Sequence, residues 1–140
     1  MVATAALPQY NSGVRRLILL PRYQREVAKL LDPEEQDAME CHIADDPERH
    51  PRIPGGSGMR KARWARPGGG KRGGVRVIYY FAVPDAIYFM SVFAKNEKEN
   101  LSDAEKQALA KILEPIKQQE HQARSRTGRI GQTNRKAREG

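Results

Sequence analysis

Apolar residues along the chain fall into short runs, and the spacing within these runs predicts strands and helices. Residues 14–21 (VRRLILLP) form an apolar run that ends at a proline, which predicts a first strand. Residues 75–83 (VRVIYYFAV) and 86–94 (AIYFMSVFA) are rich in the β-branched and aromatic residues that favour strands. Because only two residues separate these runs, they predict a hairpin. Residues 59–66 (MRKARWAR) can form a further strand.

Three other segments carry helix signals. Residues 22–31 (RYQREVAKLL) place their apolar residues at helical spacing. The next helix begins at the motif DPEE, in which an aspartate N-cap precedes a proline and two acids, and it runs to about Ala44. The motif SDAE at 102–105 is typical of a capping box and starts a third helix. We expect Pro115 to end or bend this last helix.

The resulting order, β-α-α-β-β-β-α, predicts an α+β domain. We expect a small antiparallel sheet with two N-terminal helices and one C-terminal helix, all packed on one face of the sheet. Residues 1–13 show no periodicity and are interpreted as a flexible N-terminus, so the domain spans 14–116. Residues 117–140 are polar, basic and without periodicity, which is typical of a disordered tail.

Positive charge is concentrated in two blocks of the chain. The net charge is +8, and residues 49–84 contain nine basic residues and no acid. From Lys117 onward there are seven basic and two acidic residues, which leaves a net charge of −6 for the rest of the chain. Such segregation indicates a polyanionic partner, most often nucleic acid. The alternative is a solvated basic face that maintains solubility.

Several functional classes have little support in the sequence. No apolar run approaches the roughly 18 residues of a membrane span, and no secretory signal is recognisable, so we expect a cytoplasmic protein. The segment GGGK at 68–71 lacks the Ser or Thr of a nucleotide-binding loop and precedes a strand rather than a helix. The three histidines lack metal-ligand spacing. We therefore expect no metal and no cofactor.

Strand alternation groups the basic residues of the central window. Lys61 and Arg63 are two apart and share a face, and Arg76 lies on the face opposite its apolar neighbours. If the two strands pair across the glycine-rich connection, these three residues form one cationic patch on the open face of the sheet. Lys95 closes the last strand and could reach the edge of the patch. Glu97 and Glu99 are interpreted as solvated loop acids.

This grouping has a chemical consequence. Neighbouring cations favour the neutral form of a lysine, which can then accept a proton, and arginine binds a phosphate through two oxygens. These groups are sufficient to cleave RNA by attack of the 2′-OH on the phosphodiester, without a metal. The alternative is that the patch only holds phosphates or an acidic partner protein. Further RNA contacts are expected from Arg60, Arg66, Lys71 and Arg72, with Tyr80 stacking on a base.

The runs IPGGSGMRKARWARPGGGKRGGVRVIYYF and IYFMSVFAKNEKENLS resemble the RelE/ParE superfamily of toxins from bacterial type II toxin–antitoxin modules, and most closely the HigB-type RelE-like branch. The resemblance covers roughly residues 15–115. It implies a ribosome-dependent endoribonuclease, or mRNA interferase, that enters the ribosomal A site, cuts the mRNA there and so inhibits translation.

By the same resemblance, Lys61 is the general base, Arg63 and Arg76 bind the scissile phosphate, and Lys95 assists. Some relatives carry a tyrosine shortly after the last cation, where this chain reads NEKENL, so the general acid is unassigned. The implied partners are the ribosome with its mRNA and a cognate antitoxin, usually with a helix-turn-helix domain. Toxin and antitoxin together bind operator DNA.

Two alternatives to RNA cleavage stay open at this point. The chain could be a ParE-like inhibitor of DNA gyrase, although such a protein does not need three cations on one strand face. It could also be a degenerate toxin that only binds its antitoxin or RNA.

Overall fold

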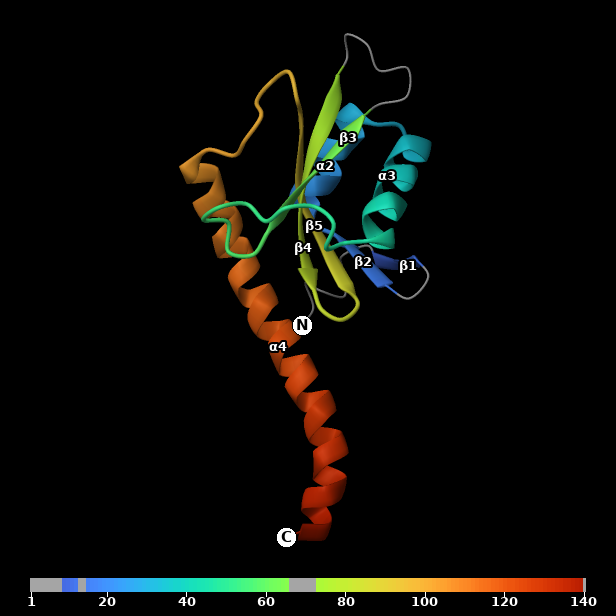
Figure 1. Cartoon of the computed structure of the whole chain (residues 1–140), viewed down its shortest axis with the longest axis vertical. Coiled ribbons are helices and arrows are strands. Elements are labelled where there is room, and N and C mark those ends of the chain that lie inside the picture. The colour runs from blue at the N-terminus through green and yellow to red at the C-terminus, as the bar shows by residue number, and fades with distance from the viewer. Residues whose placement is uncertain (1–8, 13–14, 66–72, 140) are drawn as a thin grey trace.

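The computed structural model describes residues 9–12, 15–65 and 73–139 (Figure 1). In this part of the chain, five strands form one sheet in the order β1-β2-β5-β4-β3. The strands are β1 (Gln9–Ser12), β2 (Arg15–Leu19), β3 (Arg60–Ala65), β4 (Gly74–Ala82) and β5 (Ala86–Ala94). The helices are α2 (Pro21–Leu30), α3 (Pro33–Asp45) and α4 (Asp103–Glu139). The predicted α+β class is confirmed.

The antiparallel meander formed by β3, β4 and β5 is also confirmed. β4 pairs with β5 through the short turn between them, and β3 pairs with β4 across the glycine-rich connection. In this register Arg63 lies directly opposite Arg76, and Lys61 lies opposite Ile78. The connection itself, residues 66–72, lies outside the described residues, and so does the GGGK segment.

Two features at the other edge of the sheet differ from the sequence-based expectation. β2 runs parallel to β5, so the sheet is mixed rather than wholly antiparallel. The α2–α3 pair follows β2 and provides the long crossover that parallel pairing requires. In addition, Gln9–Ser12 form β1 and pair with β2, where a flexible terminus is expected. This edge strand is held to β2 by backbone hydrogen bonds, which any sequence can form. The alternation of apolar and polar residues therefore does not reveal it.

Helices cover both faces of the sheet, and the expectation of a single covered face is wrong. On the helix-pair face, covered by α2 and α3, buried side chains such as Tyr23, Val27 and Met39 pack against Val77 and Phe89. On the α4 face, the buried core comprises Ile18, Met59, Ile78, Met90, Leu109 and Leu113. All nine residues of β5 are buried. Such a continuous apolar strand is typical of a sheet covered on both sides.

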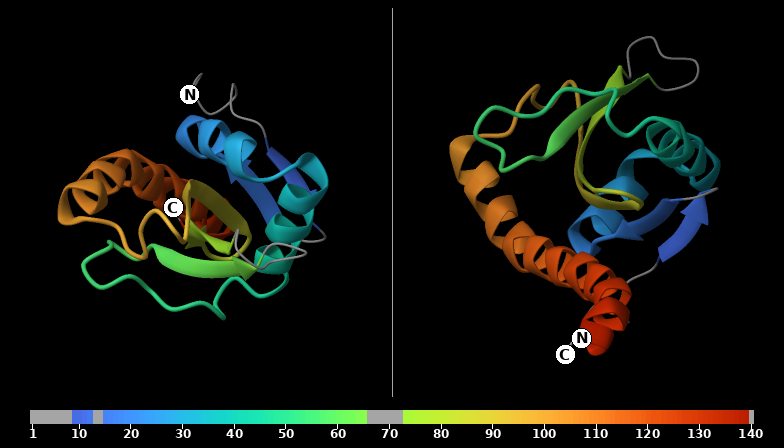
Figure 2. Two further views of the ribbon diagram at one scale, coloured as in Figure 1. Left: turned by 90° about the horizontal axis from the view of Figure 1, so that it is seen from above. Right: turned by 60° about the horizontal axis from the view of Figure 1, so that its bottom comes forward.

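Helix α4 continues beyond the predicted end of the domain. It passes through Pro115 and runs to Glu139, where the sequence indicates a disordered tail (Figure 2). Residues 117–123 (KQQEHQA) are mostly good helix formers, which favours continuation of the helix beyond the proline despite its lost hydrogen bond and steric clash. Long-range contacts also anchor this part of the helix, because Glu120 accepts hydrogen bonds from Arg16 and from the Tyr88 hydroxyl. Such contacts cannot be read from local sequence.

Candidate functional site

Three basic side chains of β3 and β4 lie together on the α4 face, as the alternation predicts. We call Lys61, Arg63 and Arg76 the cation cluster. Their strand neighbours point the other way, since Ala62 and Val77 belong to the core of the helix-pair face. The exposed fraction of the side chain is 7% for Arg76, 16% for Lys61 and 72% for Arg63. The cluster therefore runs from a buried guanidinium outward to an exposed one.

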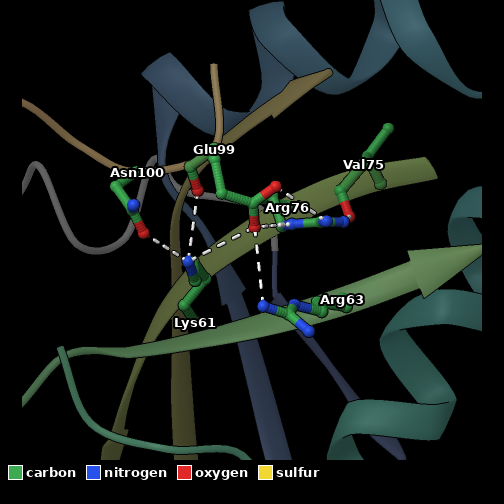
Figure 3. A network of polar contacts seen from close by, with 6 residues as sticks. All are labelled: Lys61, Arg63, Val75, Arg76, Glu99 and Asn100. Atoms are coloured by element: carbon green, nitrogen blue, oxygen red, sulfur yellow. Dashed lines mark hydrogen bonds and ion pairs between the residues drawn. The ribbon is translucent and has the colours of Figure 1, made fainter. Parts of the chain in front are cut away.

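The buried member of the cluster is fully engaged by the carboxylate of Glu99 (Figure 3). Arg76 donates from Nε to Oε2 of Glu99 at 2.7 Å and from Nη2 to Oε1 at 3.0 Å. Its Nη1 donates to the carbonyl oxygen of Val75 at 3.3 Å. This two-pronged contact is the geometry in which arginine binds a carboxylate or a phosphate.

The same acid residue meets the other two cations. Lys61 Nζ donates to the backbone oxygen of Glu99 at 3.1 Å and to Oδ1 of Asn100 at 2.5 Å, and it lies 3.6 Å from Oε2 of Glu99. Arg63 Nη2 lies 3.7 Å from Oε2 of Glu99. Figure 3 shows Glu99 reaching from the loop between β5 and α4 into the middle of the cluster. In this arrangement Lys61 acts as a hydrogen-bond donor.

The interpretation of Glu99 as a solvated loop acid is therefore wrong. Its hydrogen bonds with Arg76 lower the pKa of its carboxyl below the usual range, and the charges of the three cations add to this effect against a smaller opposing effect of desolvation. Glu99 thus carries its negative charge at neutral pH. The side chain nevertheless remains 41% exposed. The sequence offers one indirect signal for this contact. In the predicted β4–β5 hairpin, the end of β5 lies beside Arg76, so the loop that carries Glu99 begins close to the cluster.

A cavity of about 490 Å³ opens beside the cluster. Lys61, Arg63 and Lys106 supply charge to its wall, and Asn100 supplies an amide. The apolar part of the wall consists of Pro51, Ile53, Pro54 and Leu101. A space with a cationic side and an apolar side suits a nucleotide, which has a charged phosphate and a flat base.

Lys95, the fourth predicted catalytic residue, is not part of this contact network. It follows β5 and is exposed, its backbone N–H bonds to the oxygen of Gly74, and its side-chain Cδ lies near Gly73. Its position is therefore at the end of the central strand β5, beside the start of β4. Its predicted assisting role stays a prediction.

The predicted RNA-binding residues fall into two groups. Arg66, Lys71 and Arg72 lie outside the described residues. Arg60 donates to the backbone oxygens of Glu48 and His50, and Tyr80 has the ammonium group of Lys117 over its ring at 5.6 Å. Both line a second cavity of about 250 Å³, at the end of β4 away from Arg76. The structure thus separates them from the cation cluster.

No group of three or more histidine, cysteine or acidic side chains suited to a metal ion occurs among the residues whose placement is described. In the same part of the chain, no helix is both long and apolar enough to cross a bilayer.

A comparison with protein-family models matches residues 53–132 to the RelE toxin of the RelE / RelB toxin–antitoxin system. The match covers more than half of the chain. The chain belongs to the RelE toxin family. The matched segment of this RelE-type toxin contains β3, β4, β5 and α4 as far as residue 132, and with them Lys61, Arg76 and Glu99. It starts after α2 and α3, and it extends past residue 115, where the resemblance read from the sequence ends.

Family membership makes this protein a toxin with an antitoxin partner. Among the residues described, the cation cluster is the place where three basic side chains converge on a single anion. That convergence makes it the candidate functional site of the RelE-type toxin.

Proposed function

We propose that the protein is a ribosome-dependent endoribonuclease that cleaves mRNA in the A site, most similar to the HigB-type branch of the family. One observation carries this proposal: a carboxylate of the chain itself occupies the cation cluster with two-pronged geometry. A site that holds a carboxylate in this way has the donors and charge to hold a phosphodiester. The adjoining cavity supplies room for the attached nucleotide.

The proposed reaction forms no covalent bond between RNA and protein, and only protons are exchanged with protein groups. The 2′-oxygen attacks the adjacent phosphorus and loses its proton, the bond from phosphorus to the 5′-oxygen breaks, and that oxygen gains a proton. The products are a 2′,3′-cyclic phosphate and a 5′-hydroxyl end. Arg76 and Arg63 stabilise the extra negative charge on the phosphorane, an effect that depends on donors held in place beforehand. The burial of Arg76 supports this role, because a buried charge acts more strongly than one in water.

Lys61 is proposed as the general base for the 2′-OH, with Lys95 assisting from the end of β5. Before Lys61 can act as a base it must lose one proton, and the neutral amine can keep its hydrogen bonds to Glu99 and Asn100 through its two remaining N–H groups. The general acid for the 5′-oxygen stays unassigned. For partners, we propose the ribosome, a helix-turn-helix antitoxin that neutralises the toxin, and operator DNA contacted through the toxin–antitoxin complex.

The test is induction of the toxin followed by primer-extension mapping of cellular transcripts. With the parent chain we expect cuts inside codons of translated mRNA. With the double variant Lys61→Ala, Arg76→Ala we expect none. A double variant that remains as toxic as the parent would show that this mechanism is wrong. Supercoiling assays with purified gyrase separate RNA cleavage from a ParE-like activity, for which we expect no inhibition.

A further inference from the structure

The starting observation is that the Nε/Nη2 edge of Arg76, which can hold a phosphate through two oxygens, is already occupied. The edge formed by Nε and Nη2 is taken by Glu99, and Nη1 points to the carbonyl oxygen of Val75. The side chain is 93% buried, and Glu99, itself 41% exposed, lies between this edge and solvent. A phosphodiester can therefore bind the Nε/Nη2 edge of Arg76 through two oxygens only after the Glu99 carboxylate has left.

The geometry points to Glu99 as an internal competitor of the substrate: its carboxylate occupies the scissile-phosphate position on Arg76 and is exchanged for RNA phosphate when the site opens. This inference rests on the proposed function, because it assigns the phosphate position to the cation cluster. It adds a specific regulation of that site, in which the chain limits its own affinity for RNA.

Glu99 is placed so that it can leave. Its side chain is 41% exposed and belongs to the loop between Ala94 and Asp103, so it can turn into water without breaking a strand or a helix. The loop is fastened at this residue and just before it. Lys61 holds the backbone oxygen of Glu99, and Lys98 forms an ion pair with Glu105 in the first turn of α4. These contacts keep the carboxylate near the cluster after it has moved.

A purely structural ion pair predicts a different behaviour. A surface pair that only stabilises the fold would leave RNA affinity unchanged apart from the general effect of one unit of charge. The chain provides the matched comparison, because Glu97 lies two residues away in the same loop and is exposed. Its backbone N–H bonds to Ala94, and no described residue contacts its carboxylate. Glu97→Gln and Glu99→Gln therefore change the net charge equally, and only one of them opens Arg76.

The experiment measures fluorescence anisotropy of a labelled, 2′-O-methylated single-stranded RNA with the purified full chain. For Glu97→Gln we expect affinity within about threefold of the parent, because one exposed charge is screened by salt. For Glu99→Gln we expect binding about tenfold tighter than for Glu97→Gln, if the closed form holds about nine-tenths of the molecules. Adding Arg76→Met to Glu99→Gln should abolish this extra gain. Equal affinities for the two glutamine variants, or a gain that survives Arg76→Met, would overturn the inference.

A second measurement uses the protein without RNA. The Nε–H resonance of Arg76 is followed by NMR during titration with inorganic phosphate. We expect half-saturation at about tenfold lower phosphate with Glu99→Gln than with Glu97→Gln, and equal midpoints would count against the competitor. Cleavage of ribosome-bound mRNA by the parent chain is measured separately. Cleavage with equal midpoints rejects only the internal competitor, whereas a shifted midpoint without cleavage rejects only the proposed enzyme activity.

Discussion

Replacement of Arg76 by methionine tests whether the buried guanidinium acts in catalysis or in folding. We expect cleavage to fall about 10²–10³-fold, the effect of removing one preorganised donor from a transition-state site, which corresponds to about 3–4 kcal/mol. The fold should change little. The methionine keeps much of the apolar stem, and Glu99, already 41% exposed, can be hydrated after its partner is lost. No buried carboxylate is left without a partner, so the free energy of unfolding should change by less than about 1 kcal/mol.

Two assays separate these effects. Single-turnover cleavage on programmed ribosomes measures the rate, and thermal unfolding measures stability, where 1 kcal/mol corresponds to a shift of about 4 °C in Tm for a chain of this size. The matched control is Arg49→Met, which removes one positive charge from an exposed ion pair with Asp46 away from the cluster. This control should keep both rate and Tm. A folded Arg76→Met variant that cleaves within tenfold of the parent would refute the assignment of Arg76 to the phosphate.

Three further predictions concern the frame that positions the site. Leu109→Ala in α4 should lower the free energy of unfolding by about 2–5 kcal/mol in urea titrations, whereas Ile112→Ala, at a position 42% exposed, should cost well under 1 kcal/mol. Tyr23→Phe removes a buried 2.6 Å hydrogen bond to Glu40 and should cost about 1.5–3 kcal/mol, and an unchanged urea midpoint would contradict this. Burial, with the nearby basic groups, lowers the pKa of His50 below 6.5, so the unfolded chain binds a proton more readily. Stability should therefore fall as pH drops below about 6.5, and His50→Leu should flatten this slope in unfolding curves at pH 7 and pH 5.

The strands that carry the cation cluster could be predicted because strand geometry has a fixed period. Side chains alternate strictly along β3 and β4, so the sequence alone places Lys61 and Arg63 on one face and Arg76 away from its apolar neighbours. The short connection of the β4–β5 hairpin restricts its register as well. These local rules set the face on which each cation lies, and the pairing of β3 with β4 then brings the three together.

The rest of the site depends on contacts between segments far apart in the chain. Glu99 belongs to a loop, where side-chain direction follows no period, and it meets Lys61 across 38 residues of sequence. For the same reason, the sequence does not predict which face of the sheet α4 covers. Its apolar residues indicate one buried face of the helix, but nothing local states which face of the sheet receives it. The uninterrupted run AIYFMSVFA of β5 is a local sign that both faces of the sheet are covered.

Glu99 reconciles two requirements that conflict in the cation cluster. A phosphodiester site needs positive side chains close together, yet Arg63 and Arg76 sit directly opposite each other on paired strands, where like charges destabilise a sheet. A carboxylate among them offsets this repulsion in the absence of RNA. When a phosphate replaces it, the same neutralisation comes from the substrate. In the proposed mechanism, the anion that offsets the repulsion within the cation cluster is therefore also the group that RNA displaces.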